Sequence, residues 1–119
     1  MYGIVRLDLN MSPGKMAAQV SHAFLESYEV VRIRDPDRAA EYHNGSHGTK
    51  VVLGAKDLDQ LMKIYELILV EGLPTVLITD SGHVMLPHFD GSPVVTAVGI
   101  GPVKRNEIHH ITRKLQVVR

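Results

Sequence analysis

A lysine stands in the first turn of the first predicted helix, where a cation is unfavourable unless it has a partner. Ser12 is a natural N-cap, and Pro13 suits the first helical position because its missing N–H would be unpaired there in any case. Lys15 therefore falls where the helix dipole is positive. Free backbone N–H groups at a helix start also attract anions. We expect this lysine to help hold a phosphate.

The same helix face carries further polar side chains. Gln19, His22 and Glu26 follow Lys15 at intervals of four, three and four residues, which places all four on one face. A titratable base, His22, therefore lies two turns from the expected phosphate site.

An acid is expected to meet this lysine at one edge of a sheet. One predicted strand leads into Ser12, and another runs into Asp80. In open α/β sheets, ligands gather beyond the C-terminal ends of the strands. If the two strands are parallel, Lys15 and Asp80 lie at the same edge. An acid beside an amine near a helix start suits a reaction on a phosphate-bearing ester.

The elements that must position these groups follow from hydrophobic periodicity. The pattern predicts strands at 2–9, 49–53, 75–78 and 94–100, and helices at 13–33, 57–70 and 106–113. Residues 34–48, rich in Asp, Pro, Asn and Gly, are predicted to form a loop with at most a short turn. Helices between strands imply parallel crossovers and a sheet covered on both faces. The short link between the last two strands permits an antiparallel pair, so we expect an α/β protein with a mixed sheet.

Length and composition limit the class of protein. We expect 119 residues, with 45% hydrophobic and 22% charged side chains, to form one globular domain, 1–119. The absence of cysteine excludes disulfides, thiolate metal sites and a cysteine nucleophile. No apolar run approaches the roughly 20 residues that span a bilayer, and no signal peptide is visible. We expect a cytoplasmic protein with no membrane partner.

The charges are balanced overall but unevenly placed. The net charge is zero, whereas nucleic-acid-binding domains are usually basic. The C-terminal stretch nevertheless gathers five cations against a single Glu107: Lys104, Arg105, Arg113, Lys114 and Arg119. Such a local patch can hold one RNA end, with modest and salt-sensitive affinity.

Three motifs, in order along the chain, identify a family. The run from Gly14 to Ala23 (GKMAAQVSHA) matches every fixed position of the pattern Gly-Lys-x-Ala-Ala-Gln-x-Ser-His-Ala. Asp80-Ser81-Gly82 is close to Asp-Ala-Gly, and residues 96–102 (TAVGIGP) are close to Thr-Val-x-x-Ile-Gly-Pro. Together they resemble the type II peptidyl-tRNA hydrolases over nearly the whole chain.

The resemblance implies a fold and an activity. The expected fold is a three-layer α/β/α sandwich with a four-stranded mixed sheet, commonly in a homodimer. The implied reaction is hydrolysis of the ester between a peptide, or an N-blocked amino acid, and the tRNA 3′ end. The products are free tRNA and the released peptide. No metal or organic cofactor is implied.

The resemblance also suggests roles for individual residues. Lys15 would bind phosphate or the 3′ ribose and stabilise developing negative charge, and Asp80 would orient or activate the attacking water. His22 would support the site or tune Asp80, and Thr96 would place the carbonyl through its hydroxyl. The predicted substrate-binding residues are Ser12, Gly14, Gln19, Ser81, Gly82, Lys104 and Arg105.

One departure from the family pattern concerns the site directly. The family usually has a threonine two residues after Asp-Ala-Gly, whereas this chain has Val84, which lacks a hydroxyl. The loop that follows, residues 85–93, is longer than usual and carries His88, Asp90 and Ser92. Either another hydroxyl serves instead or catalysis is weakened.

Two other functions stay open. The first is an RNA-end or nucleotide-binding module that has lost turnover, which Val84 and the neutral net charge favour. The second is a metal protein, suggested by histidine pairs: His43 and His47, His83 and His88, and His109 and His110. No His-Glu-x-x-His helix supports a metal site. Serine hydrolase chemistry is disfavoured, because Ser81 lies in no Gly-x-Ser-x-Gly elbow.

Overall fold

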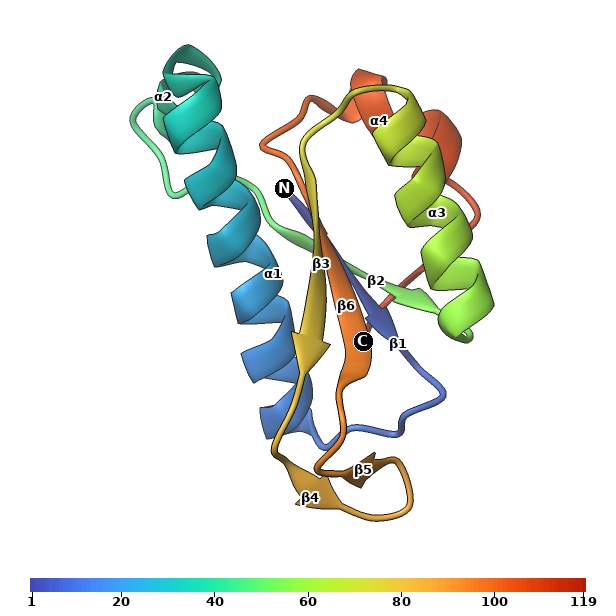
Figure 1. The fold of residues 1–119 in the computed structure, drawn as a ribbon. Coiled ribbons are helices and arrows are strands. Elements are labelled where there is room, and N and C mark those ends of the chain that lie inside the picture. The colour runs from blue at the N-terminus through green and yellow to red at the C-terminus, as the bar shows by residue number, and fades with distance from the viewer.

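A mixed sheet with helices against both of its faces makes up the computed structural model, which describes residues 1–119 (Figure 1). The elements in chain order are β1 (Tyr2–Arg6), α1 (Pro13–Arg34), α2 (Pro36–His43), β2 (Val51–Ala55), α3 (Leu58–Val70), β3 (Thr75–Asp80), β4 (Val84–Met85), β5 (Phe89–Asp90), β6 (Val94–Ile100), α4 (Arg105–Thr112) and β7 (Gln116–Val117). None of the four helices has both the length and the apolar composition needed to cross a membrane.

The strand directions bring the ends of β1 and β3 to the same side. The main sheet has the order β3-β6-β1-β2-β7, with β1 parallel to β2 and both β1 and β3 antiparallel to β6. Strands β1 and β3 therefore run in the same direction, and their C-terminal ends reach one edge of the sheet. This is the arrangement that the predicted meeting of Lys15 and Asp80 requires.

The α/β class and the mixed sheet are confirmed, but the expected count of four strands is wrong. The sheet has five strands, because β7 pairs antiparallel with β2. A strand of two residues is too short to show an alternating pattern. The main antiparallel strand β6 begins and ends where it was predicted, and β3 extends two residues further than predicted, to Asp80.

One face of the sheet is covered by α3 and α4. The Asp57 side chain caps α3, accepting a hydrogen bond from the Gln60 backbone N–H at 2.9 Å. Buried apolar residues of these two helices and of the strands beneath them form a single cluster: Ile4, Leu53, Ala55, Leu61, Ile64, Ile68, Val98, Ile100 and Ile108. The helix predicted from periodicity at 57–70 is confirmed, because its stripe of Leu and Ile meets this cluster.

The opposite face is covered by α1, which approaches β6 very closely. A Cβ atom built on Gly99 would lie 2.2 Å from the backbone oxygen of Ala23, so only glycine permits this approach. Val20 and Ala23 bury their side chains in the second apolar cluster, together with Ile78 and Phe89. The close packing fixes where α1 lies against the sheet, and so where its first turn lies.

Two predicted loops contain regular structure. Residues 36–43 form α2, because Asp35 caps it, with its carboxylate accepting from the Arg38 backbone N–H, and Pro36 occupies its first position. Those Asp and Pro residues indicate a helix start as well as a loop. The segment after Asp80 forms the small hairpin of β4 and β5, whose strands of two residues carry no periodic signal.

Candidate functional site

The side chains of Lys15 and Asp80 meet where α1 begins and β3 ends. Lys15 Nζ donates to Asp80 Oδ2 at 2.6 Å, and the two side chains are 13% and 19% exposed. The predicted proximity of these two residues is confirmed. Because both side chains are mostly buried but keep some exposed surface, a small reacting group can reach an amine and a carboxylate together.

The first turn of α1 holds Lys15 in place by ordinary capping. Ser12 is the N-cap, and its Oγ accepts from the Lys15 backbone N–H at 3.2 Å. Pro13 follows at the first helical position, and no acidic residue lies in the first turn. The carboxylate of Asp80, brought by another strand, supplies the negative charge that the helix start favours. Gly14 is exposed, with open space where a side chain would stand.

An aromatic ring from the hairpin forms a further wall around the lysine. The Lys15 ammonium lies 4.8 Å from the ring centroid of Phe89, which is 3% exposed. The ring of His83 contacts Phe89 edge-on, with centroids 5.3 Å apart, and His83 Nε2 is buried without a hydrogen-bond partner. Phe89 was not predicted as a site residue, because a single aromatic residue in a polar loop gives no sign of where the loop folds back.

Thr96 does not open onto the site, and its predicted direct contact with the ester carbonyl needs correction. The Thr96 side chain is fully buried on β6, and its Oγ1 donates to Gln19 Oε1 at 2.6 Å. Gln19 lies one turn beyond Lys15 and lines the cleft next to Asp80. The hydroxyl of Thr96 therefore fixes the Gln19 amide instead of reaching a substrate.

A cleft of about 460 Å³ runs from Asp80 between α1 and the outer side of β3. Its lining residues are Gln19, His22, Glu26, Val76, Leu77, Ile78, Thr79 and Asp80. His22 is exposed and makes no hydrogen bond or ion pair with another side chain. The structure thus brings His22 into one cleft with Asp80 but not into contact with it.

Ser81 and Gly82 lie just beyond the acid, at the base of the hairpin. Both are exposed, and Gly82 has a φ of +78°, a left-handed conformation that favours glycine. Its backbone N–H donates to the Gly91 carbonyl oxygen at 2.9 Å, which closes the hairpin. Val84, at the position of the family threonine, is 68% exposed on β4.

Lys104 and Arg105 do not lie at this site. They follow β6, which is antiparallel to β1 and β3, so they emerge at the opposite end of the sheet (Figure 1). Lys104 is exposed and lies 3.5 Å from a carboxylate oxygen of Glu41. Lys104 and Arg105 were predicted to bind substrate as part of a local basic patch, but strand direction separates them from Lys15.

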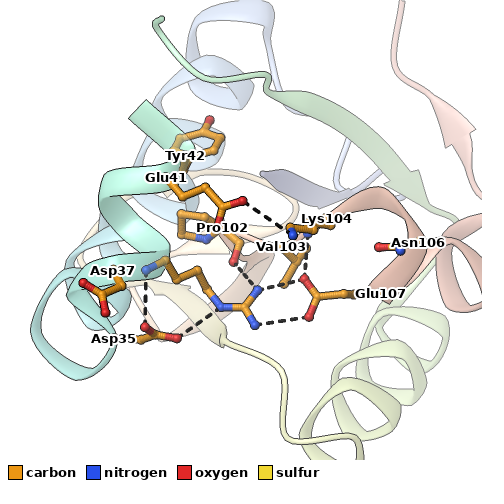
Figure 2. Close-up of a pocket in the computed structure, with 10 residues that line it drawn as sticks. Asp35, Asp37, Glu41, Tyr42, Pro102, Val103, Lys104, Asn106 and Glu107 are labelled. Carbon is orange, nitrogen blue, oxygen red and sulfur yellow. Dashed lines mark hydrogen bonds and ion pairs between the residues drawn. The ribbon is translucent and has the colours of Figure 1, made fainter. Parts of the chain in front are cut away.

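Lys104 borders a larger cavity, of about 630 Å³, in which most of the charged side chains are paired with one another (Figure 2). The Arg38 guanidinium donates to both carboxylate oxygens of Glu107, at 2.8 and 3.1 Å, and to the Pro102 carbonyl oxygen at 3.2 Å. The hydrogen bonds from Arg38 hold the pKa of Glu107 below its usual value. This cluster of ion pairs ties α2 to α4, and of the acids that line the cavity only Asp37 makes no ion pair.

The histidine pairs do not form a metal centre. No group of three or more His, Asp or Glu side chains is placed so as to hold a metal ion. His43 instead packs edge-on against Tyr28, with ring centroids 5.0 Å apart, and His110 Nε2 lies 2.5 Å from a carboxylate oxygen of Glu71. These two histidines therefore contribute to contacts between elements.

Comparisons with known proteins agree on one family. Residues 1–118 match the family model described as "Peptidyl-tRNA hydrolase PTH2". The chain is 37% identical over 116 residues to a peptidyl-tRNA hydrolase of Methanopyrus kandleri, covering 98% of this chain and 95% of that protein. It is 36% identical to the Methanocaldococcus jannaschii protein of that name, covering 99% and 98%. The corresponding Sulfolobus acidocaldarius protein is 34% identical, with 97% and 96% covered.

Proposed function

This chain belongs to the peptidyl-tRNA hydrolase family PTH2 and is an enzyme that hydrolyses peptidyl-tRNA, and we propose that Lys15 and Asp80 are its reaction centre. The observation that carries the proposal is the 2.6 Å contact between these two side chains at the mouth of a cleft. A carboxylate placed there can accept a proton from the attacking water, and the ammonium beside it can stabilise negative charge on the same ester.

Each group has a defined part in the reaction. Asp80 accepts a proton from a water molecule as the water oxygen attacks the ester carbonyl carbon. The Lys15 ammonium stabilises the negative charge that develops on the substrate oxygens, which is the largest contribution such a site can make. The carbon–oxygen ester bond then breaks, and the tRNA 3′ oxygen takes up the proton. Free tRNA and the peptide acid leave, and the acid releases its own proton to solvent as it becomes a carboxylate.

Gln19 is the third group of the proposed centre, and Thr96 positions it. Because Thr96 Oγ1 donates to Gln19 Oε1, the amide nitrogen of Gln19 is the end left to donate into the cleft. It is placed to donate to the carbonyl oxygen as that oxygen becomes negative. His22 lies further along the same cleft, where it can contact the bound substrate and hydrogen-bond to water near Asp80.

The surface around the pair suits one RNA end. Ser12 and Gly14 lie on one side of it, and Ser81 and Gly82 on the other, and all four are exposed. Small side chains leave room for the terminal ribose and phosphates, which Lys15 attracts. The zero net charge of the chain implies modest affinity for tRNA, and contacts of Lys15 with phosphates would make that binding sensitive to salt. We further propose a homodimer, and a cytoplasmic location where tRNA is found.

A tRNA-binding module without turnover is the second candidate, because Val84 stands where the family resemblance leads us to expect a threonine hydroxyl. The experiment that separates the two uses purified protein and N-acetyl-aminoacyl-tRNA in water enriched in ¹⁸O. Hydrolysis releases tRNA and places the heavy oxygen in the amino-acid carboxylate. Bound but uncleaved tRNA at micromolar protein would establish the binding module instead.

A further inference from the structure

We propose that the peptide of the substrate binds as an added strand along the open edge of β3, an inference that rests on the proposed function. Strand β3 is the last strand of the main sheet, and β6 is its only partner. The cleft that starts at Asp80 follows this same edge, with Val76–Asp80 as one wall and α1 as the other. The reaction centre and the open edge are therefore continuous.

The backbone groups of the edge point into this opening. The Gly101 N–H donates to the Pro74 carbonyl oxygen at 2.9 Å, which makes those two residues a hydrogen-bonded pair of the antiparallel ladder. Such pairs alternate with pairs whose N–H and C=O groups point away from the partner strand. With Thr75 opposite Ile100 and Leu77 opposite Val98, the backbone groups of Thr75 and Leu77 face away from β6.

Nothing in the sequence of β3 protects this edge. Proteins usually block an edge strand with lysine, proline or an inward-pointing charge. Strand β3 reads TVLITD, and its only charged residue is Asp80, at the reaction centre. A bulge between Ile78 and Thr79 changes the register just before the acid. Bulges near active sites commonly redirect a side chain, here Asp80 toward Lys15.

Strand direction and length define how the peptide lies. A peptide parallel to β3 has its C-terminal carbonyl, the ester carbon, at the Asp80 end. From Val76 to Asp80 the edge spans about 13 Å at about 3.3 Å per residue, which accommodates four or five peptide residues. Backbone hydrogen bonds of an added strand do not depend on side-chain identity. This mode suits a substrate whose peptide sequence varies.

The first test is a series of peptidyl-tRNAs that share one tRNA and one C-terminal residue and carry one to eight residues. We expect kcat/KM to rise by roughly tenfold as the peptide grows to four or five residues, because two backbone hydrogen bonds are added. With longer peptides it should stay level. N-methylation of one amide should remove the gain, and N-methylation of the next amide should not, because alternate groups face β3.

The second test compares two substitutions at one position. Leu77→Pro removes the outward N–H, whereas Leu77→Ala shortens the side chain and keeps that N–H, so Leu77→Ala is the matched control. We expect the ratio of kcat/KM for long over short peptides to fall toward one only in Leu77→Pro, with circular dichroism and unfolding curves as the check on folding.

If kcat/KM does not change with peptide length while N-acetyl-aminoacyl-tRNA is still cleaved, the peptide does not bind as an added strand. The proposed hydrolase function would then still stand. The same holds if Leu77→Pro dissociates a dimer without changing that ratio, because a second copy of the chain would then occupy the edge. Failure to cleave any member of the series would instead overturn the proposed function.

Discussion

Lys15 Nζ and Asp80 Oδ2 lie 2.6 Å apart although 65 residues separate them in the chain. The contact exists because β1 leads into α1 on the same side of the sheet at which β3 ends. Phe89 closes that site from the hairpin, and Gln19 borders it from the next turn of α1. The proposed reaction centre is thus assembled from three separate segments of the fold: α1, the end of β3 and the hairpin.

Replacement of Lys15 by alanine should reduce activity without unfolding the protein. The ammonium is the cation nearest the developing negative charge, so we expect Lys15→Ala to lower kcat/KM by roughly tenfold or more. A single, partly exposed ion pair contributes about 1 kcal/mol or less to the free energy of unfolding. Steady-state hydrolysis and thermal unfolding measure the two effects. An unchanged rate would remove Lys15 from the mechanism.

Thr96 should act through Gln19, and isosteric replacement can show this. Thr96→Val leaves the buried Gln19 Oε1 without its donor, which should cost about 1–3 kcal/mol of the free energy of unfolding. The misplaced amide should lower kcat while KM changes by less than about twofold, because binding is unaffected. Thr96→Ser keeps the hydroxyl and should restore both. A Thr96→Val enzyme with normal kcat would make the threonine purely structural.

Two glycines should respond oppositely to alanine. Gly99→Ala forces a methyl group against the Ala23 backbone oxygen, so α1 must move away from β6. We expect a loss of about 1–3 kcal/mol in the free energy of unfolding, and reduced activity because Lys15 moves with the helix. Gly14→Ala meets no atom within 4 Å and should leave stability equal or slightly higher. Chemical denaturation of both variants tests this, and equal stability losses would contradict it.

The pairing of Arg38 with Glu107 should give a distinct acid dependence of stability. Hydrogen bonds from Arg38 depress the pKa of Glu107 in the folded state. A carboxylate with a depressed pKa stabilises the fold above its unfolded pKa, and this contribution is lost as the pH falls through the folded value. The free energy of unfolding should therefore fall below pH 4.5 less steeply in Glu107→Gln than in the unmodified chain. Parallel curves for the two proteins would contradict the assignment.

Long elements could be predicted from the sequence because their signals are local, and the pair of Lys15 and Asp80 could be predicted from a rule of sheet topology. The stripe of α3 and the run of β6 each bury one continuous apolar surface, and Ser12, Pro13 and Asp57 mark helix starts by capping chemistry. The place of Asp80 beside Lys15 followed from the assumption that the strands before them run in the same direction. These features depend on nearest neighbours in the chain, or on a single rule of topology.

The remaining features depend on contacts that no local pattern encodes. Strands β4, β5 and β7 have two residues each, and they exist only because a partner strand is present. Phe89 reaches Lys15 through the fold of the hairpin. Lys104 and Arg105 were predicted to bind substrate, but the antiparallel direction of β6 carries them to the end of the sheet opposite Lys15.

The rate of the chemical step in Asp80→Asn tests the central claim most directly. The amide keeps the size of the side chain but cannot accept the proton of the attacking water. Single-turnover hydrolysis of N-acetyl-aminoacyl-tRNA, at saturating enzyme, measures that step apart from binding. The proposed mechanism predicts nearly abolished cleavage, with tRNA affinity within a few fold of the unmodified enzyme. A normal single-turnover rate with collapsed affinity would make Asp80 a binding residue and contradict the mechanism.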